Sequence, residues 1–381
     1  KTQKRLPSKM KREKKRKMEN KSKHPAAPKF VKSGLFRDVK SFGDLSYRFD
    51  KLKTTTEKGN AFEVFAEMWL VVIRGARGVT TSKNITPSMR KEKKLPLGVG
   101  DGGVDIIFKG ENNEWTACQV KYRRDQNTVT WGELGTFFAA SEEFDQRLVF
   151  TNCPEVTKKA SNKNRYYTVR LEDLNRLTPE DFSRMEKWLR TSKVEPIKKL
   201  KKRGYQVKAV DKICKALEKD PRTQAIMACG IGKTLVALWV AQQMGAKSII
   251  LFFPSLALLR QTYREWMKYF YELDMLFLAI CSDKKITGID EVFYKACDSE
   301  FPVSTDEKDL TVRLKRAKKL GKTTVLFSTY QSGRVVSRSC RKAKFKFNLG
   351  VFDEAHKTVG KESKLSALAL FDRNIEIEKR F

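Results

Sequence analysis

The chain has 381 residues, 40% of them hydrophobic, which is enough for about two globular domains with separate cores. Lysine and arginine number 79 against 45 acidic residues, and the resulting net charge of +34 favours a polyanionic partner such as nucleic acid. No apolar run reaches the roughly 18–20 residues of a membrane span. Seven scattered cysteines without a C-x-x-C pair argue against a disulfide or zinc scaffold and indicate an intracellular protein.

Residues 1–34 are predicted to form a disordered basic arm. Residues 1–32 carry 14 lysines or arginines against two glutamates, with almost no apolar periodicity. The segment KREKKRK at 11–17 fits a nuclear-import signal, a DNA-gripping tail or a solubilising tail. The arm therefore leaves open whether the protein works in a bacterial cytoplasm, a nucleus or a viral factory.

A first globular domain is predicted over residues 35–190. An apolar helical stretch is followed by two strands around a polar turn, and then by a helix, a strand and a largely helical region. This order is typical of a small α/β domain. The predicted ranges are 58–73 for the first helix, 98–125 for the strand pair, 129–144, 147–152 and 171–190.

The strand pair carries an acid and then Gln-x-Lys, which is the chemistry of a metal-dependent phosphodiesterase. Asp105 and the backbone carbonyl of Val120 would hold Mg²⁺, and Gln119 would stand where an acidic ligand often sits. Lys121 would orient the attacking water and stabilise the developing charge. Glu63, from the preceding helix, would complete the metal site. The alternative, that these are ordinary solvated strand-end residues, stays open.

A polar, basic, proline-containing stretch at 191–203 predicts a linker. From residue 204 to 381 the pattern changes to apolar strands that alternate with helices, as in a parallel-sheet ATPase. The polar residues 283–319 are interpreted as an insertion at the edge of this sheet. The main predicted elements are a helix from Tyr205 to Leu217, a strand entering the loop at Gly230, a helix after that loop, a strand at 248–254, a helix at 255–270, and strands at 323–329 and 349–352.

The sequence AIMACGIGKTLVAL predicts a phosphate-binding loop between a strand and a helix. Gly230 and Gly232 let backbone N–H groups point at phosphate, and the helix N-terminus adds positive potential. Lys233 would reach the β- and γ-phosphates, and the Thr234 hydroxyl would ligate Mg²⁺. Met227 stands at the first position of the motif, where glycine is usual.

A second motif, LGVFDEAH at 349–356, places two acids at the end of an apolar strand. Asp353 would hold Mg²⁺ through water, and Glu354 would polarise the water that attacks the γ-phosphate. Because the pair follows a phosphate-binding loop at a suitable distance, the two motifs together predict an NTPase core.

The motifs in chain order resemble two known families. GNAFE, GDGGVD and CQVKY resemble an Mrr-type restriction-endonuclease domain of the PD-(D/E)xK class. GYQ, MACGIGKT, FFPSLALLRQTYREW, FSTYQS and DEAH resemble successive motifs of a superfamily 2 helicase. Over about residues 45–381, a nuclease followed by a helicase is similar to the N-terminal half of type ISP ATP-dependent restriction enzymes.

The resemblance implies a restriction-endonuclease-like α/β domain followed by a RecA-like parallel-sheet helicase lobe. It implies ATP and Mg²⁺ as cofactors, with Gln206 at the adenine and residues 254–262 and 328–332 facing DNA phosphates. Since the chain starts without methionine and stops where motif III begins, we expect a fragment whose second helicase lobe lies elsewhere in the same polypeptide. The ATPase residues would be Lys233, Thr234, Asp353 and Glu354, and the nuclease residues Glu63, Asp105, Gln119 and Lys121.

Three functions follow from these patterns. The favoured one is an ATP-dependent helicase or translocase on duplex DNA with a fused Mg²⁺-dependent endonuclease, although RNA stays open as the track. The second is a viral or repair helicase whose nuclease-like domain is a catalytically silent DNA clamp. The third is a nucleic-acid-binding or scaffold protein with vestigial motifs. Plasmid cleavage separates the first two, and ATP binding excludes the third. The sequence leaves the oligomeric state open.

Overall fold

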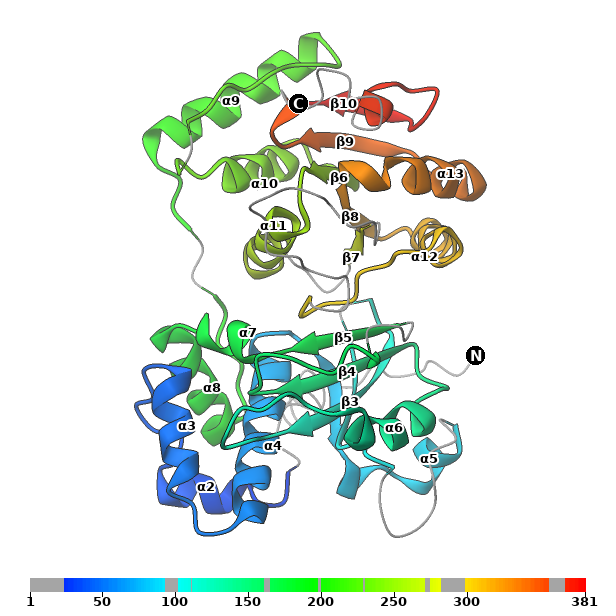
Figure 1. The fold of residues 1–381 in the computed structure, drawn as a ribbon. Coiled ribbons are helices and arrows are strands. Elements are labelled where there is room, and N and C mark those ends of the chain that lie inside the picture. The colour runs from blue at the N-terminus through cyan, green and yellow to red at the C-terminus, as the bar shows by residue number, and fades with distance from the viewer. Residues whose placement is uncertain are drawn as a thin grey trace, which may run out of the picture. The chain divides into compact units, whose positions relative to one another are not determined.

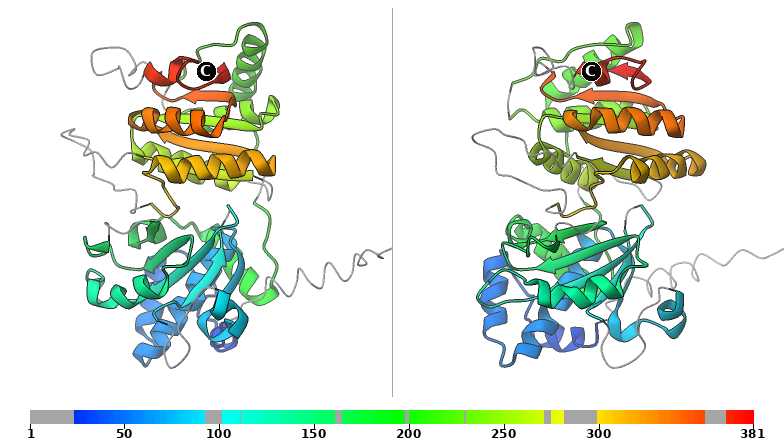
Figure 2. Two further views of the ribbon diagram at one scale, coloured as in Figure 1. Left: turned by 90° about the vertical axis from the view of Figure 1, so that its right-hand side faces the viewer. Right: turned by 45° about the vertical axis from the view of Figure 1, so that its right-hand side comes forward.

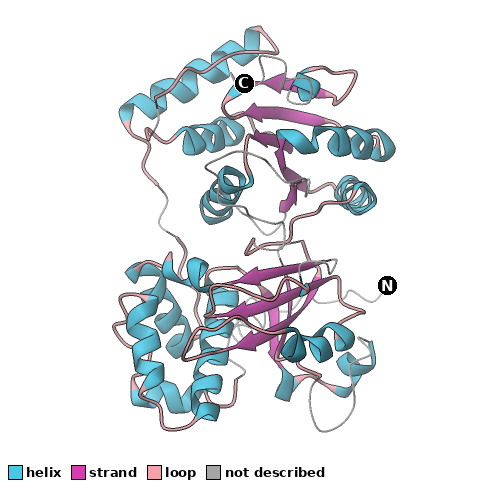
Figure 3. Ribbon diagram, viewed as in Figure 1, coloured by secondary structure: helices cyan, strands magenta, loops and turns pink. Residues whose placement is uncertain are grey.

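The computed structural model describes residues 24–92, 102–110, 112–160, 165–197, 200–228, 230–270, 275–281, 299–355 and 367–381. These residues fall into two compact units, one ending at Pro196 and the other beginning at Ile197 (Figure 1). Each unit is built around its own five-stranded sheet, drawn in magenta in Figure 3. Within the part of the chain that the structure describes, no helix has the length and apolar character needed to cross a membrane.

The sheet of the N-terminal unit is mixed, with the strand order β1-β2-β3-β4-β5. The pairings of β1 with β2 and of β2 with β3 are antiparallel, whereas β3, β4 and β5 run parallel. The predicted strand pair around a polar turn corresponds to β2 and β3. The strands are β1 (Arg77–Thr81), β2 (Ile106–Lys109), β3 (Trp115–Lys121), β4 (Gln146–Thr151) and β5 (Tyr166–Val169).

Helices cover both faces of this sheet (Figures 1 and 2). Most of them share one large hydrophobic core with one face of the sheet. The central helix of this core, α4 (Thr55–Val72), is apolar nearly all round because it lies between the sheet and the outer helices. The opposite face carries α6 (Trp131–Ala140), where Phe138 packs edge-on against Tyr166. The helices of the large core are α2 (Ala27–Ser33), α3 (Phe42–Asp50), α4 (Thr55–Val72), α7 (Leu171–Asn175) and α8 (Pro179–Thr191). A short helix, α5, spans Pro87–Glu92.

The prediction of a disordered arm over residues 1–34 was wrong for its last part. Residues 1–23 lie outside the described residues, but α2 falls inside the predicted arm. Phe30 of α2 is only 1% exposed, and its ring meets that of Phe36 edge-on at 6.3 Å. A helix of seven residues is too short to show apolar periodicity, so the lysines around it dominated the sequence pattern.

The sheet of the C-terminal unit is parallel throughout, with the order β10-β9-β6-β8-β7. Parallel strands are buried on both faces, which explains why these segments are continuous apolar runs in the sequence. β6, β8 and β9 are the strands that the sequence predicted. The five strands are β6 (Ser248–Phe253), β7 (Met275–Ile280), β8 (Thr323–Thr329), β9 (Phe347–Phe352) and β10 (Ile377–Arg380).

Helices cover both faces of the parallel sheet and enclose two separate cores (Figures 1 and 2). One face carries α9 (Gly204–Lys219), α10 (Lys233–Gln243) and α11 (Leu256–Tyr269). The other carries α12 (Glu307–Leu320) and α13 (Gly333–Ala343). This doubly covered parallel sheet is the architecture expected of a RecA-like lobe.

The strand predicted before the phosphate-binding loop is not formed by residues 224–228. Ile226 in this segment is 98% exposed. The segment begins beside the sheet, where Arg222 makes a single bridge to Arg380 of β10 and the N–H of Thr223 donates to the Arg380 carbonyl. An apolar composition predicted a strand here, but β10 is only four residues long and the pairing does not continue beyond the bridge.

The interpretation of residues 283–319 as a polar insertion was wrong for its second half. Residues 282–298 lie outside the described residues, whereas most of the remainder belongs to α12. Leu310 and Leu314 of that helix are fully buried against the sheet. Charged residues on the other faces of α12 masked this narrow apolar stripe in the sequence.

Candidate active sites

The candidate nuclease residues gather where β2 and β3 run side by side. Asp105 directly precedes β2, and its Oδ2 accepts a hydrogen bond from the Val120 N–H of β3 at 2.6 Å. Gln119 and Lys121 flank Val120 in β3, on the opposite face of the strand from it. Three of the predicted residues are therefore placed within one strand pair by a short stretch of sequence.

Glu63 reaches the same strand pair from α4. Burial raises the pKa of the Cys118 thiol in β3 well above its ordinary value, and the charges of Asp105 and Glu63 raise this pKa further. Both carboxylates therefore act electrostatically on the same thiol of β3. Glu63 Oε2 is also 2.9 Å from His24 Nε2. Glu63 is thus linked to β3 by its charge and to His24 by a direct contact.

Gln119 supplies a buried amide to this place. Its side chain is 3% exposed, and among the described atoms its Oε1 has no hydrogen-bond partner. The backbone of Gly103 passes so close that a Cβ there would lie 2.9 Å from Gln119 Nε2. A buried, unsatisfied amide oxygen is destabilising unless a ligand contacts it. The Gln119 amide oxygen is therefore a candidate for contact with a ligand.

The donor set around β3 suits Mg²⁺, which prefers carboxylate, carbonyl and amide oxygens. Within the described residues, no three histidine, cysteine or acidic side chains cluster as they would around a metal ion. A metal here would accordingly need the Gln119 amide beside the two carboxylates of Asp105 and Glu63.

The candidate phosphate-binding loop has the backbone geometry that its glycines allow. Gly230 and Gly232 have φ of 78° and 84°, in the left-handed region that favours glycine. Gly232 caps α10, so Lys233 and Thr234 form the first turn of that helix. A Cβ on Gly232 would lie 2.8 Å from Gln206 Nε2, so a larger residue would displace the Gln206 amide and would also be strained at this positive φ.

Two acids follow β9, and the second of them contacts the lysine of this loop. Lys233 Nζ is 3.1 Å from Glu354 Oε1, a contact between residues 121 positions apart in the chain. Asp353 stays attached to the sheet, since its N–H donates to the carbonyl of Phe252 at 3.0 Å. Glu354 has φ of 53°, a conformation in which a non-glycine residue is held by its surroundings. The fold therefore unites the two predicted ATPase motifs.

Gln206, predicted to contact an adenine, also supports the phosphate-binding loop. Its Nε2 donates to the Ile231 carbonyl at 3.0 Å, and its Oε1 accepts from the Arg203 N–H at 2.9 Å. Tyr205 donates its hydroxyl to the same Ile231 carbonyl at 3.2 Å. A side-chain amide has two N–H groups and two acceptor positions, so each end of Gln206 retains capacity for a further ligand.

Tyr330, which the sequence analysis assigned to DNA contact, instead supports the two acids. It lies in the turn after β8, and its hydroxyl donates to the Asp353 carbonyl at 2.8 Å. Its ring stacks on Phe252 with 5.7 Å between centroids. Burial, and then the charges of Asp353 and Glu354, raise the pKa of Tyr330 well above its ordinary value, so the hydroxyl remains a donor. Only structure could assign this role, because the acceptor is a backbone atom.

The expectation that residues 328–332 face DNA phosphates was wrong for most of their side chains. Ser328, Thr329 and Ser332 are completely buried together with the Tyr330 ring. Thr329 Oγ1 and Ser332 Oγ lie 2.9 Å apart, so these hydroxyls satisfy one another inside the fold. The helicase resemblance suggested contact with DNA, whereas these hydroxyls bond to one another inside the fold.

Tyr330→Phe tests the role of the hydroxyl because the stacked ring is kept. Loss of one hydrogen bond of about 0.5–1.5 kcal/mol should lower the rate of ATP hydrolysis roughly 2–10-fold, with little change in thermal stability. Steady-state phosphate release at saturating ATP measures this rate. An unchanged rate in a variant that folds normally would show that the hydroxyl does not support Asp353 during catalysis.

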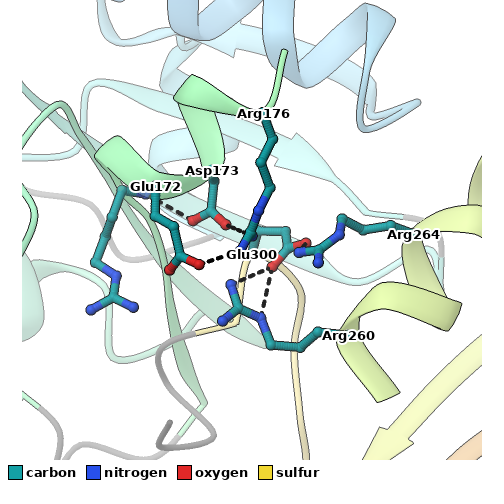
Figure 4. Close-up of polar contacts among 7 residues, drawn as sticks. Glu172, Asp173, Arg176, Arg260, Arg264 and Glu300 are labelled. Atoms are coloured by element: carbon teal, nitrogen blue, oxygen red, sulfur yellow. Dashed lines mark hydrogen bonds and ion pairs between the residues drawn. The ribbon is translucent and has the colours of Figure 1, made fainter. Parts of the chain in front are cut away.

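Residues 254–262 were also expected to face DNA phosphates, but Arg260 points into the fold. It is 2% exposed and donates to Glu300 Oε2 at 3.0 Å, while Arg264 donates to Glu300 Oε1 at 2.6 Å (Figure 4). Burial alone would raise the pKa of Glu300, but the two guanidinium groups outweigh burial and hold it below its ordinary value. The cluster fastens α11 to the segment before α12.

Removing the shared acid should therefore destabilise the C-terminal unit. Glu300→Ala removes the carboxylate that the two guanidinium groups share, one of them deeply buried. Loss of a buried ion-pair partner costs about 3–5 kcal/mol of unfolding free energy. Because the pKa of Glu300 is lowered in the folded state, its contribution is present at neutral pH and is lost as pH falls through that pKa. Urea unfolding at neutral and acidic pH measures both effects. Lys342→Met, which breaks an exposed pair with Glu307, is the control and should have a much smaller effect.

Comparisons with known families assign both units. Residues 87–188 match the Mrr-type family described as restriction endonuclease, and residues 199–378 match the family described as type III restriction enzyme, res subunit. The chain joins a restriction-endonuclease domain to a helicase-type res domain. No curated protein sequence matches the chain.

Two solved structures are similar to the chain. The ATP-dependent type ISP restriction-modification enzyme LlaBIII bound to DNA matches 90% of this chain and 22% of its own, with 23% identity and a TM-score of 0.71. A nuclease-deletion mutant of the type ISP enzyme LlaGI in complex with a DNA substrate mimic matches 48% of this chain and 17% of its own, with 28% identity and a TM-score of 0.39. The LlaBIII similarity confirms the predicted fold class. The chain spans less than a quarter of the length of either enzyme.

Proposed function

We propose that this chain is the nuclease domain and first motor lobe of an ATP-dependent DNA restriction enzyme. ATP hydrolysis would move the enzyme along duplex DNA, and the nuclease would cut the phosphodiester backbone. The observation that carries the proposal is that a restriction-endonuclease family and a res-subunit family match the two units in chain order. The contacts of Asp105 with Val120 and of Lys233 with Glu354 support it. The DNA bound to LlaBIII and the net charge of +34 support DNA as the partner.

In the motor lobe, the Lys233 side chain would leave Glu354 and pair with the β- and γ-phosphates of ATP. This change of partner would release the Glu354 carboxylate to polarise the attacking water. Thr234 and Asp353 would hold Mg²⁺, which when bound neutralises charge on the phosphates. A second RecA-like lobe in the same polypeptide would complete the site with an arginine finger. Two observations support this change of partner. Lys233 contacts Glu354, and it lies in the first turn of α10, where the phosphates would bind.

In the nuclease domain, Asp105, Glu63, the Gln119 amide and the Val120 carbonyl would hold Mg²⁺. When bound, the ion would supply Lewis-acid chemistry and a more acidic water. Lys121 would orient the attacking water and stabilise the charge that develops on the scissile phosphate. Its place two residues after Gln119 on the same strand supports this role, since alternate residues of a strand share a face.

Plasmid cleavage tests the proposed function. Supercoiled plasmid incubated with the full-length polypeptide, ATP and Mg²⁺ should be nicked or linearised, and EDTA should prevent cleavage. If the plasmid stays intact while ATP is hydrolysed, the nuclease part of the proposal fails.

A second candidate, a helicase with a catalytically silent DNA clamp, is favoured by one observation. Gln119 is neutral where an acidic ligand often stands, so the site would attract a divalent cation with one negative charge fewer. This candidate predicts salt-sensitive DNA binding by the N-terminal unit without cleavage under any metal condition.

A further inference from the structure

His24 lies at the start of the N-terminal unit and contacts a candidate nuclease residue directly. It precedes α2, in the segment that composition alone assigned to a disordered arm, yet its side chain is almost completely buried. Its Nε2 is 2.9 Å from Glu63 Oε2 on α4, although the two residues are 39 positions apart. A buried imidazole thus contacts Glu63, the acid that α4 would contribute to the cation site.

The hydrogen bond at the second ring nitrogen, Nδ1, shows that His24 Nε2 is the donor to Glu63. The N–H of Ala26 donates to His24 Nδ1 at 3.2 Å, so Nδ1 is an acceptor and carries no proton. The remaining ring proton is then on Nε2, which donates it to Glu63 Oε2. The backbone turn before α2 thus selects the tautomer that holds the carboxylate.

This hydrogen bond restricts a side chain that would otherwise be flexible. Glutamate has several rotamers, and fixing them in advance removes an entropic cost from ligand binding. The bond occupies one carboxylate oxygen of Glu63 and leaves the other for a ligand. The Asp105 carboxylate is likewise held by a hydrogen bond from the protein, donated by the Val120 N–H.

We propose that His24 is a positioning residue for the nuclease cation site, where its Nε2–H orients Glu63 toward a divalent cation bound with Asp105. The inference rests on the proposed nuclease function and extends that site to the first residues of the domain. Groups that hydrogen-bond to metal ligands typically change metal affinity by about 10–100-fold when they are removed.

The competing explanation is that His24 merely fastens α2 to α4. The structure offers a matched control for it, because Lys29 of α2 also pairs with Glu57 of α4, one helix turn and more away from Glu63. If fastening were the whole role of His24, then Lys29→Met should have a similar effect on the cation site.

Two substitutions at His24 separate its two hydrogen bonds. In H24N the side-chain oxygen can still accept from the Ala26 N–H, but nothing reaches Glu63. In H24Q the longer side chain places an N–H near the position of the histidine Nε2. The probe is Mn²⁺ alone, titrated into the purified chain without nucleotide and detected by electron paramagnetic resonance, with Asp105→Asn defining the binding that depends on this site.

We expect Asp105-dependent Mn²⁺ binding to weaken about 10–100-fold in H24N, to remain within a few-fold of wild type in H24Q, and to be unchanged in Lys29→Met. Equal affinities in H24N and H24Q, or equal losses in H24N and Lys29→Met, would overturn the inference and leave the nuclease proposal standing. Absence of any Asp105-dependent Mn²⁺ binding in the wild type would overturn both.

A measurement on the wild-type chain covers the case in which H24N does not fold. The chain has two histidines, His24 and His356, so an imidazole spectrum of histidine-labelled protein is simple to assign. Bound Mn²⁺ should broaden the His24 signals, and this broadening should disappear in Asp105→Asn. Sharp His24 signals at saturating Mn²⁺ would overturn the inference.

Discussion

Lys233→Ala is expected to reduce ATP hydrolysis by the full-length polypeptide by on the order of 10²–10³-fold, the usual loss when one charge-stabilising donor is removed from a transition state. The ammonium group lies at the N-terminus of α10, where phosphate would bind. Among residues 230–234 of the phosphate-binding loop, all of which the structure describes, no other side chain is positive. Alanine is a favourable helix residue, so the fold should survive. DNA-stimulated phosphate release measures the effect.

Two controls sharpen this result. Glu354→Gln should slow hydrolysis while ATP binding persists, because the amide keeps the shape of the side chain but polarises water poorly. Lys268→Ala removes an exposed lysine of the same lobe and should leave the rate unchanged. If Lys233→Ala hydrolysed ATP at the wild-type rate, the assignment of the motor site would be wrong.

The second large effect is expected in the nuclease domain. Asp105→Asn and Lys121→Ala should each reduce plasmid cleavage by about 10²-fold or more, since one removes a charged cation ligand and the other a charge-stabilising group. Asparagine can still accept the Val120 hydrogen bond through its amide oxygen, so the strand pair should remain intact. Gel analysis of supercoiled plasmid over time gives the cleavage rate.

The two substitutions should differ in a second measurement. Asp105→Asn should weaken Mn²⁺ binding, whereas Lys121→Ala should retain it, because Lys121 acts on the phosphate and not on the cation. Asp125→Ala, which changes an exposed acid in the turn after β3, serves as the control and should cleave normally. Normal cleavage by Asp105→Asn would contradict the proposed cation site. ATP hydrolysis should be unaffected by all three changes.

Sequence patterns predicted several elements directly but missed others of equal length, among them the 14-residue helix α12. α4, β3 and β6 were found because their apolar residues form long runs or clear alternations. β1, with the sequence RGVTT, and the four-residue β5 were missed because so few residues carry no distinct periodicity. Their pairing partners, not their composition, make them strands.

The site residues divide into those placed by local sequence and those placed by contacts between distant segments. Asp105, Gln119 and Lys121 could be predicted because they lie within one strand pair, so their proximity follows from local sequence. The contributions of His24 and Tyr330 could not be predicted. Each depends on a contact between distant segments, the first with a carboxylate of another helix and the second with a backbone carbonyl.

The packing of α2 determines where the N-terminal unit can be shortened. Trimming the basic tail at residue 35, the boundary that composition suggests, would delete Phe30 and expose the aromatic surface around Phe36 that it covers. Loss of a buried phenylalanine alone costs about 3–5 kcal/mol, a large share of a typical domain's stability. A shortened protein that begins at His24 would instead lose only residues 1–23 and keep the whole aromatic cluster. The choice of start site thus decides whether the isolated unit can be produced in folded form.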